Sequence, residues 1–229
     1  MELRKTHLAP LFVESREEEI SSLWTLFSSA TILSSQMMEE FCFKLRNPAP
    51  RAKAAFECFN RLRVTENLGQ FSPRLVSTIC LDIDTQSSDL DIICQFEDAS
   101  VFAAEMIRTY SSRSGFEISK LNPQDQSIFA RFHAHGFIIE IFGQPIPVEQ
   151  QNAYRHFMVM QRLLSHDRRN SLRQAVRHLK QRGLKSEPAF AHCLKLSGDP
   201  FKAMLDLYDA SDGELAKLVE RFEERGASL

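Results

Sequence analysis

The chain has 229 residues, which is enough for one compact unit that buries about 70% of the surface exposed when it is unfolded. Apolar residues make up 43% and charged residues 25%, as in soluble globular proteins, and no run of about 18 apolar residues is present, which excludes a membrane-spanning helix. The first twenty residues include Glu14, Glu17, Glu18 and Glu19, unlike a signal peptide, and the five cysteines are scattered, without a Cys-x-x-Cys pair. We therefore expect a cytoplasmic protein with buried thiols and no membrane partner.

Helices are predicted for much of the first 65 residues. A capping box, Ser-Arg-Glu-Glu at 15–18, opens a helix over residues 15–28, and further helical pattern covers 36–45. After a break at Pro48 and Pro50, a helix is expected over 52–62. Residues 1–65 are therefore expected to form an N-terminal helical segment.

The most informative stretch consists of Val76-Ser77-Thr78, ten spacer residues, and Asp89-Leu90-Asp91-Ile92-Ile93. This pattern predicts a strand, an exposed turn and a second strand. Because side chains alternate along a strand, Asp89 and Asp91 are expected on the same face. Asp89 alone could be a turn residue, but the apolar run continues past Asp91, where an unpaired buried carboxylate would cost several kcal/mol.

Two further acids, Asp82 and Asp84, follow Ser77 too closely for a turn and a return strand. They lead into the polar stretch 85–88, so we interpret them as strand-end and loop residues.

A third acid of interest, Glu140, interrupts an apolar run at 137–142, beyond a helix predicted over 100–112. His135-Gly136 predicts a tight turn that joins strands 129–134 and 137–142 into a hairpin. A two-residue turn places Arg131 directly opposite Glu140, with His133 on the same face. Arg131 is therefore expected either near a bound phosphate or as the ion-pair partner that neutralises the acid.

Asp89, Asp91 and Glu140 are expected to converge at the edge of this sheet, which we place within residues 66–148. Converging carboxylates are suited to divalent cations, and Mg²⁺ prefers hard oxygen ligands of this kind. The hydroxylated pair Ser77-Thr78 beside them suggests phosphate chemistry.

Beyond Pro147 the chain is predicted to be helical. The expected helices cover residues 149–164, 170–182, 189–196, 200–209 and 212–225, so 149–229 form a C-terminal helical region. Between 150 and 186, nine Lys or Arg residues accompany a single acid, a net charge of +8 that leaves −10 for the remainder. One helix face carries Arg169, Arg173, Arg177 and Lys180. The basic helix 168–182 is either a solvated stripe or a surface for a triphosphate or for a polyanionic acceptor such as RNA.

A small mixed sheet with helices before and after it is an α+β fold. The small pair, the spacer, the Asp-x-Asp motif and the distant strand acid resemble the DNA polymerase β-like nucleotidyltransferase superfamily. The chain is most similar to a branch described only as a domain of unknown function, from about Arg51 to about Asp209. Motifs that carry the resemblance include Ser88-Asp89-Leu90-Asp91-Ile92-Ile93 and Glu140-Ile141-Phe142-Gly143-Gln144.

This resemblance implies a set of site residues. The catalytic acids, which would bind two Mg²⁺ ions or Mn²⁺ in their place, are Asp89, Asp91 and Glu140. The residues that would contact a nucleoside triphosphate are Ser77, Thr78, Ser88 and Arg131. The family has Gly where this chain has Ser77.

The leading hypothesis is a Mg²⁺-dependent nucleotidyltransferase that moves a nucleoside monophosphate from a triphosphate to a hydroxyl of an unknown acceptor. The acceptor could be an RNA end, a protein or a small molecule. The alternative is a catalytically inactive binding or scaffold protein with a nucleotidyltransferase fold. Ser77 favours this alternative, because its Cβ would crowd the approach of a triphosphate.

Overall fold

The computed structural model describes residues 49–122 and 126–226. Its α-helices are α2 (Pro50–Arg61), α3 (Val64–Leu68), α4 (Ala99–Tyr110), α5 (Asn152–His166), α6 (Ser171–Gln181), α7 (Ser186–Leu194), α8 (Pro200–Asp206) and α9 (Asp212–Gly226). Its strands are β1 (Arg74–Leu75), β2 (Leu90–Gln95), β3 (Glu117–Asn122), β4 (Ser127–Ala134) and β5 (Phe137–Gln144). Short 3-10 helices are η1 (Gly69–Phe71), η2 (Thr78–Leu81) and η3 (Val148–Gln150). The helices predicted over 15–28 and 36–45 lie outside the described residues.

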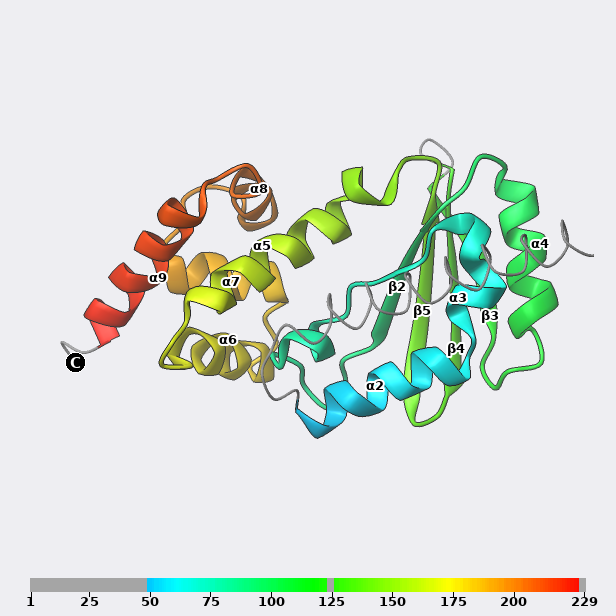
Figure 1. Cartoon of the computed structure of the whole chain (residues 1–229), viewed down its shortest axis with the longest axis horizontal. Coiled ribbons are helices and arrows are strands. Elements are labelled where there is room, and N and C mark those ends of the chain that lie inside the picture. The colour runs from blue at the N-terminus through cyan, green and yellow to red at the C-terminus, as the bar shows by residue number, and fades with distance from the viewer. Residues whose placement is uncertain (1–48, 123–125, 227–229) are drawn as a thin grey trace, which may run out of the picture.

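The strands form one mixed sheet in the order β1-β2-β5-β4-β3 (Figure 1). β2 and β5 are parallel, whereas the other neighbouring strands are antiparallel. A parallel pair needs a crossover, which is supplied here by the segment that contains α4 and the strands β3 and β4. The α+β fold class is therefore confirmed for the described part of the chain, while the division at 1–65, 66–148 and 149–229 stays a prediction.

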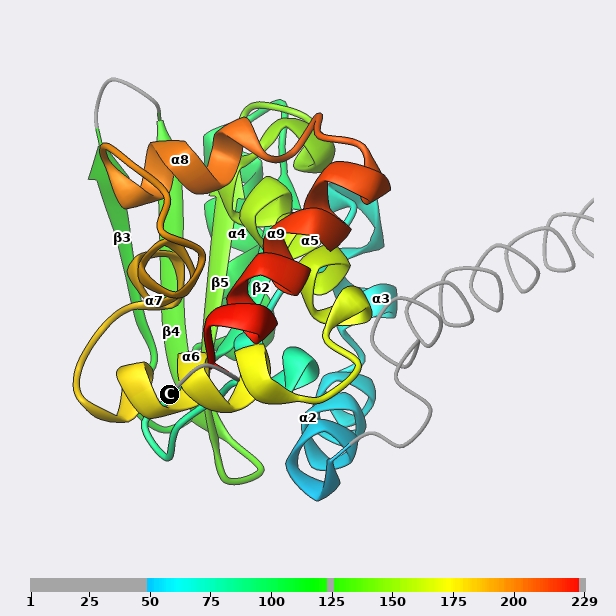
Figure 2. The same cartoon turned by 90° about the vertical axis from the view of Figure 1, so that its left-hand side faces the viewer.

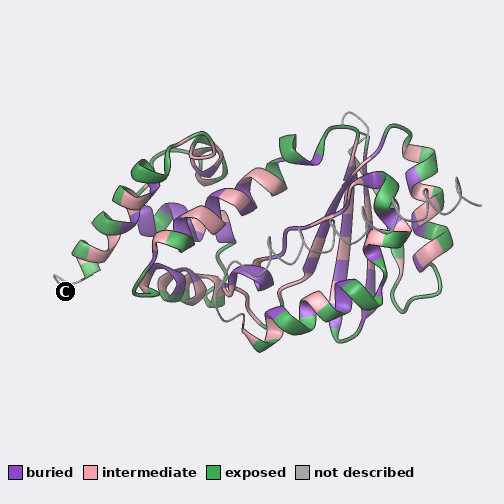
Figure 3. Ribbon diagram, viewed as in Figure 1, coloured by how far each residue is buried: buried purple, intermediate pink, exposed green. Residues whose placement is uncertain are grey.

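The two faces of the sheet differ in burial (Figure 3). Along β5, Ile139 and Ile141 are buried on one face, whereas Glu140 and Phe142 are half-buried on the other, as the two-residue period of a strand requires. α4 covers the buried face so closely that a Cβ added to Gly143 would lie 2.4 Å from the Phe102 ring. The opposite face keeps partial access to solvent, and it carries the acids.

The C-terminal helices gather on one side of the sheet, and Figure 2 looks onto them. α5 leads away from β5 and packs against α8 and α9, while α6 and α7 pack together. Their inward sides are apolar, with Leu163, Val176 and Phe190 fully buried. Burying a side chain of this size stabilises the fold by about 1.5–3 kcal/mol, so these helices are tied to one another mainly by apolar contact.

The hairpin and the helix predictions that fall in the described range are confirmed. The turn at His135-Gly136 has positive φ at both residues, and it pairs Arg131 with Glu140 and His133 with Ile138. One helix differs at its start: α7 begins at Ser186 instead of residue 189, because a proline in the first turn of a helix loses no hydrogen bond.

The strand predicted at 76–78 is wrong. β1 already ends at Leu75. Beyond it, the Val76 amide still donates a hydrogen bond to the Asp91 carbonyl of β2, at 2.9 Å. The Ser77 hydroxyl then accepts a hydrogen bond from the Ile79 amide at 3.3 Å, which caps and starts η2. The chain therefore leaves the sheet at Ser77 and turns towards the C-terminal helices.

Among the helices in the described ranges, none combines the length and the apolar character needed to cross a membrane.

Candidate functional site

The three predicted acids meet on the half-open face of the sheet. Parallel pairing of β2 with β5 places Asp91 beside Glu140 in register, and Asp89 precedes β2 directly. Burial raises the pKa of Asp91 from 3.8 to about 7, and the charges of Glu140 and Asp89 contribute to that rise. Burial, the charge of Asp89 and a hydrogen bond with its side chain also raise the pKa of Glu140. The acids therefore repel one another, and the positive charges of Arg131 and Lys180 offset this repulsion only in part.

Such a group fits a hard divalent cation by donor chemistry and by charge, because carboxylate oxygens are the ligands that Mg²⁺ prefers. A bound cation would also relieve the repulsion that raises both pKa values. Within residues 49–122 and 126–226, however, no group of three or more His, Cys, Asp or Glu side chains is arranged so that it could hold a metal ion on its own. Further ligands would have to come from water and substrate phosphate, which Mg²⁺ commonly uses.

A pocket of about 390 Å³ opens over this face, between the sheet, α5 and the start of α7. It is lined by Val76, Thr78, Asp91, Ile92, Ile93, Phe129, Glu140, Phe142, Ala153, His156, Met160 and Glu187. This volume lies in the range of pockets that bind small molecules. The structure thus brings Thr78, Asp91 and Glu140 into one cavity.

Ser77 stands at the junction between the sheet and η2. Its side chain is buried, and its hydroxyl donates to the Asp89 carbonyl at 2.6 Å while accepting from the Ile79 amide. The Ser77 hydroxyl also lowers the pKa of Asp91. The serine therefore holds the backbone of Asp89 in place, and its predicted contact with a triphosphate stays a prediction.

Arg131 and Ser88 flank the acids. The Arg131 Nε atom lies 3.6 Å from Glu140 Oε1, so the ion-pair interpretation of the hairpin is confirmed. The Ser88 hydroxyl accepts a hydrogen bond from the Thr85 amide at 2.9 Å, and Arg51 donates to the Ser88 carbonyl at 3.2 Å. Ser88 thus belongs to a turn that these two hydrogen bonds hold in place. Contacts of Arg131 or Ser88 with a nucleotide stay predictions.

Three of the four cations on the predicted basic face pack onto η2 and its cap, so the interpretation as a solvated stripe is wrong for them. The fourth, Arg169, is exposed and pairs with Glu223 at 3.8 Å. Arg173 is buried and donates to the Leu81 carbonyl. Arg177 contacts Asp82, whose carboxylate lies 2.5 Å from the guanidinium. These cations satisfy the carbonyls and the acid at the end of a short helix, where negative partial charge accumulates.

Lys180, on the same face, lies next to Thr78, a residue that lines the pocket. Its ammonium donates to the Thr78 hydroxyl at 3.0 Å, and its pKa is lowered by burial although Asp84, Glu187 and Asp91 attract its charge. The sequence placed Lys180 on the correct helix face but could not show which segment that face would meet.

Asp82 and Asp84 lie in the loop after η2, as predicted for loop acids. Asp82 is the C-terminal cap of η2, so it does not end a strand. Asp84 pairs with Arg51 at 3.2 Å, which ties α2 to this loop.

Two pocket residues were missed as individual site residues, His156 and Glu187. His156 Nδ1 lies 3.3 Å from Glu187 Oε1, and both side chains are mostly buried. The available signal was a histidine on the apolar side of α5, between Ala153 and Met160 at helical spacing.

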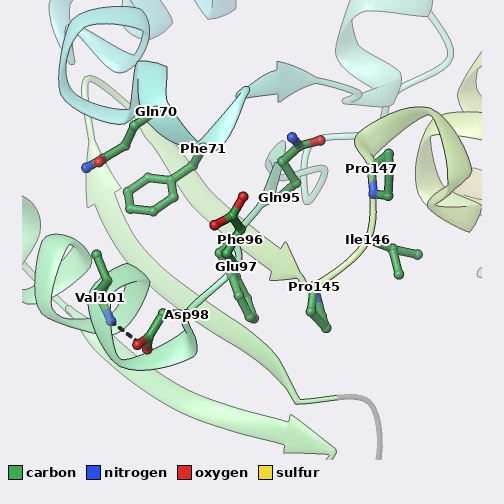
Figure 4. A pocket seen from close by; sticks show the side chains of 10 residues that line it. All are labelled: Gln70, Phe71, Gln95, Phe96, Glu97, Asp98, Val101, Pro145, Ile146 and Pro147. Atoms are coloured by element: carbon green, nitrogen blue, oxygen red, sulfur yellow. Dashed lines mark hydrogen bonds between the residues drawn. The ribbon is translucent and has the colours of Figure 1, made fainter.

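A second hollow, of about 580 Å³, lies at the carboxyl ends of β2 and β5 (Figure 4). It is lined by Gln70, Phe71, Gln95, Phe96, Glu97, Asp98, Val101, Pro145, Ile146 and Pro147. The Asp98 carboxylate is occupied there as the N-cap of α4, accepting from the amides of Ser100 and Val101. This hollow is larger, but it contains none of the predicted site residues, so the smaller pocket is the candidate site.

Residues 57–207 match the family described as "Domain of unknown function (DUF4269)", and the chain belongs to this family. The predicted relation to a domain of unknown function is thereby confirmed. No curated protein is significantly similar to the chain. A chain of the solved GLD-2/RNP-8 complex is similar at 13% sequence identity, over 81% of this chain and 82% of that chain, with a TM-score of 0.47. A likeness of this degree supports no statement about activity.

Proposed function

We propose that the protein is a Mg²⁺-dependent nucleotidyltransferase that moves a nucleoside monophosphate from a nucleoside triphosphate to a hydroxyl group. The observation that carries the proposal is the trio of Asp89, Asp91 and Glu140, which crowd together on a half-open sheet face, where burial and mutual repulsion raise the pKa values of Asp91 and Glu140. This repulsion costs the fold stability, whereas a bound cation would relieve it, which favours a cation site.

The trio would supply the protein ligands of the cation, and water and substrate phosphate would supply the others. The charges of Asp89 and Glu140 both act on Asp91. Bound Mg²⁺, or Mn²⁺ in its place, would stabilise the entering and leaving oxygens of the displacement. Ser77 orients the acids by holding the Asp89 backbone. The pocket floor beyond the trio is largely apolar.

A triphosphate would lie over Thr78 and Lys180. The ammonium is half-buried and has a lowered pKa, so it is poorly solvated and would gain from an anionic partner. Its bond to the Thr78 hydroxyl directs it towards the pocket that contains Asp91. Arg131, which pairs with Glu140, would add positive charge for the triphosphate on the other side of that acid.

The reaction would exchange one bond to phosphorus for another. The acceptor hydroxyl would give up its proton to the Glu140 carboxylate, which lines the pocket, and its oxygen would bond to the α-phosphorus. The bond from the α-phosphorus to the pyrophosphate breaks, and pyrophosphate leaves with its electron pair.

The acceptor could be an RNA end, a protein or a small molecule. A polyanionic acceptor would meet the exposed cations at the two ends of α6, Arg168 and Arg182, because Arg173, Arg177 and Lys180 are engaged by η2 and the residue that caps it. Binding through these two cations would weaken as the salt concentration rises.

The rival is an inactive scaffold of the same fold, which is favoured by the occupied hydroxyl and buried side chain of Ser77. Calorimetric titration with each nucleoside triphosphate, with and without MgCl₂, separates the two. We expect Mg²⁺-dependent binding by the wild-type protein and a loss of about a hundredfold or more in Asp89→Ala and Asp91→Ala, because carboxylates are the cation's protein ligands. Asp209→Ala, which removes an exposed carboxylate outside the pocket, should bind as the wild type does.

Incubation with α-labelled triphosphates and a cell extract then tests the transfer itself. Label on a macromolecule or small molecule that depends on Asp91 supports the enzyme and identifies the acceptor. Binding that ignores the acid substitutions, or no binding of any triphosphate, refutes the proposal.

A further inference from the structure

The pocket contains a polar pair in its otherwise apolar part. His156 comes from α5 and Glu187 from the first turn of α7, and both line the cavity with the acids. The floor beneath them is formed by Phe129 and Phe142, direct cross-strand neighbours on the open sheet face that remain half-buried. An aromatic floor of this kind can stack a flat heterocycle.

His156 is fixed between two acceptors. Its Nε2 atom lies 3.0 Å from the Phe201 carbonyl, and its Nδ1 atom lies 3.3 Å from the Glu187 carboxylate. A neutral imidazole has only one N–H, so both contacts can be hydrogen bonds only if a second proton is shared between His156 and Glu187. The pair therefore holds the Glu187 carboxylate in one orientation.

Glu187 can still accept further hydrogen bonds after this contact, because an ionised carboxylate accepts about four hydrogen bonds and donates none. It also lies within electrostatic reach of Lys180, which attracts Asp91 as well. One ligand can therefore span the phosphate side of the pocket and Glu187.

An acceptor of this kind distinguishes nucleobases by their donors. Adenine and cytosine carry an exocyclic amino group where uracil has a carbonyl oxygen, and guanine carries its amino group at C2, whereas uracil has no amino group and offers only its ring N3–H as a donor. A carboxylate binds the amino group and repels the carbonyl oxygen.

We infer that Glu187, oriented by His156, binds the amino group of a nucleobase stacked on Phe129 and Phe142, so that the site takes adenine, cytosine or guanine nucleotides in preference to uridine nucleotides. This inference rests on the proposed function, since it names the base of the triphosphate.

The test is calorimetric binding of the Mg²⁺ complexes of ATP, CTP, GTP and UTP, in α,β-methylene form to prevent turnover. At least one amino-bearing nucleotide should bind the wild-type protein roughly tenfold or more tightly than UTP, as expected for a hydrogen bond to a charged acceptor. Glu187→Gln should reduce this ratio to about threefold or less, because an amide can also donate to the uracil carbonyl. Glu220→Gln, which removes an exposed carboxylate on α9, should leave the ratio unchanged.

His156→Gln provides a second variant. It should reduce the preference against UTP, because Glu187 is no longer held, while the Mg²⁺ dependence of binding persists. Circular dichroism checks that both variants fold.

The failures are distinguishable. Binding of all four nucleotides with equal affinity, a preference for UTP, or a ratio that survives Glu187→Gln overturns the inference and leaves the nucleotidyltransferase proposal standing. Binding of none of them overturns both.

Discussion

Replacing Asp91 with asparagine removes the charge at the centre of the acid trio while keeping nearly the same shape. In the folded protein, burial and the neighbouring carboxylates raise the pKa of Asp91 from 3.8 to about 7. The folded state therefore retains the Asp91 proton over a pH range in which the unfolded chain has released it. By linkage, the wild-type free energy of unfolding falls as the pH rises from about 4 to about 7.

The magnitude follows from the shift of about three pKa units. Each unit corresponds to about 1.4 kcal/mol, so ionisation of Asp91 costs the folded state up to about 4 kcal/mol. The asparagine side chain of the variant does not titrate and escapes this cost. We expect Asp91→Asn to be about 2–4 kcal/mol more stable than the wild type at pH 8, while at pH 4 the two differ by less than about 1 kcal/mol.

Urea unfolding followed by circular dichroism at pH 4, 5, 6, 7 and 8 measures this difference. Subtracting the wild-type curve from that of the variant cancels the titration of the groups that do not interact with Asp91. Asp209→Asn is the matched control, because this exposed carboxylate forms only a surface ion pair at 3.7 Å with Arg155, of a kind worth about 1 kcal/mol or less.

The reasoning is refuted if the stability gap between Asp91→Asn and the wild type is independent of pH, or if the variant is the less stable protein at pH 8. A gap that opens below pH 4 would likewise contradict it, since both states are then protonated. If MgCl₂ is added at pH 8, the wild type should gain stability and Asp91→Asn should gain little, because only the wild type presents the repelling carboxylates.

Three further predictions test the surroundings of the trio. Ser77→Ala should lower the free energy of unfolding by about 1–2 kcal/mol in urea titrations, because the hydroxyl makes two buried hydrogen bonds, and an unchanged midpoint would contradict its positioning role. Lys180→Met should strengthen the repulsion among the acids, so its loss of stability should be larger at pH 8 than at pH 4, whereas a uniform loss would show a packing role alone. Gly143→Ala should cost about 1–3 kcal/mol because the new Cβ meets the Phe102 ring, while Gly69→Ala, with nothing within 4 Å, should be tolerated; thermal unfolding compares them.

Structural features that depend only on residues close together in the chain could be predicted from the amino-acid sequence alone. The two-residue turn at His135-Gly136 set the register of the hairpin, and with it the contact between Arg131 and Glu140. Helical periodicity located the C-terminal helices and the basic face of α6. Asp91 was conspicuous because a carboxylate inside an apolar run is costly unless something compensates it.

Contacts between distant segments were decided only by the tertiary structure. The parallel pairing of β2 with β5 determines that Asp91 lies beside Glu140, and spacing along the chain does not encode which strands pair. The predicted strand at 76–78 was wrong because the Ser77 hydroxyl donates to the Asp89 carbonyl and accepts from the Ile79 amide. The first of these hydrogen bonds depends on where β2 begins.

The amino-acid order by itself established that acids, hydroxyls and a basic helix face are present, because alternation and helical period are local properties of a chain. Packing decided what each of them meets: α6 turned its cations onto η2, and α5 and α7 brought His156 to Glu187. The physical reason is that burial of apolar surface is not directional, so it drives helices together without specifying from sequence which polar side chains will face each other.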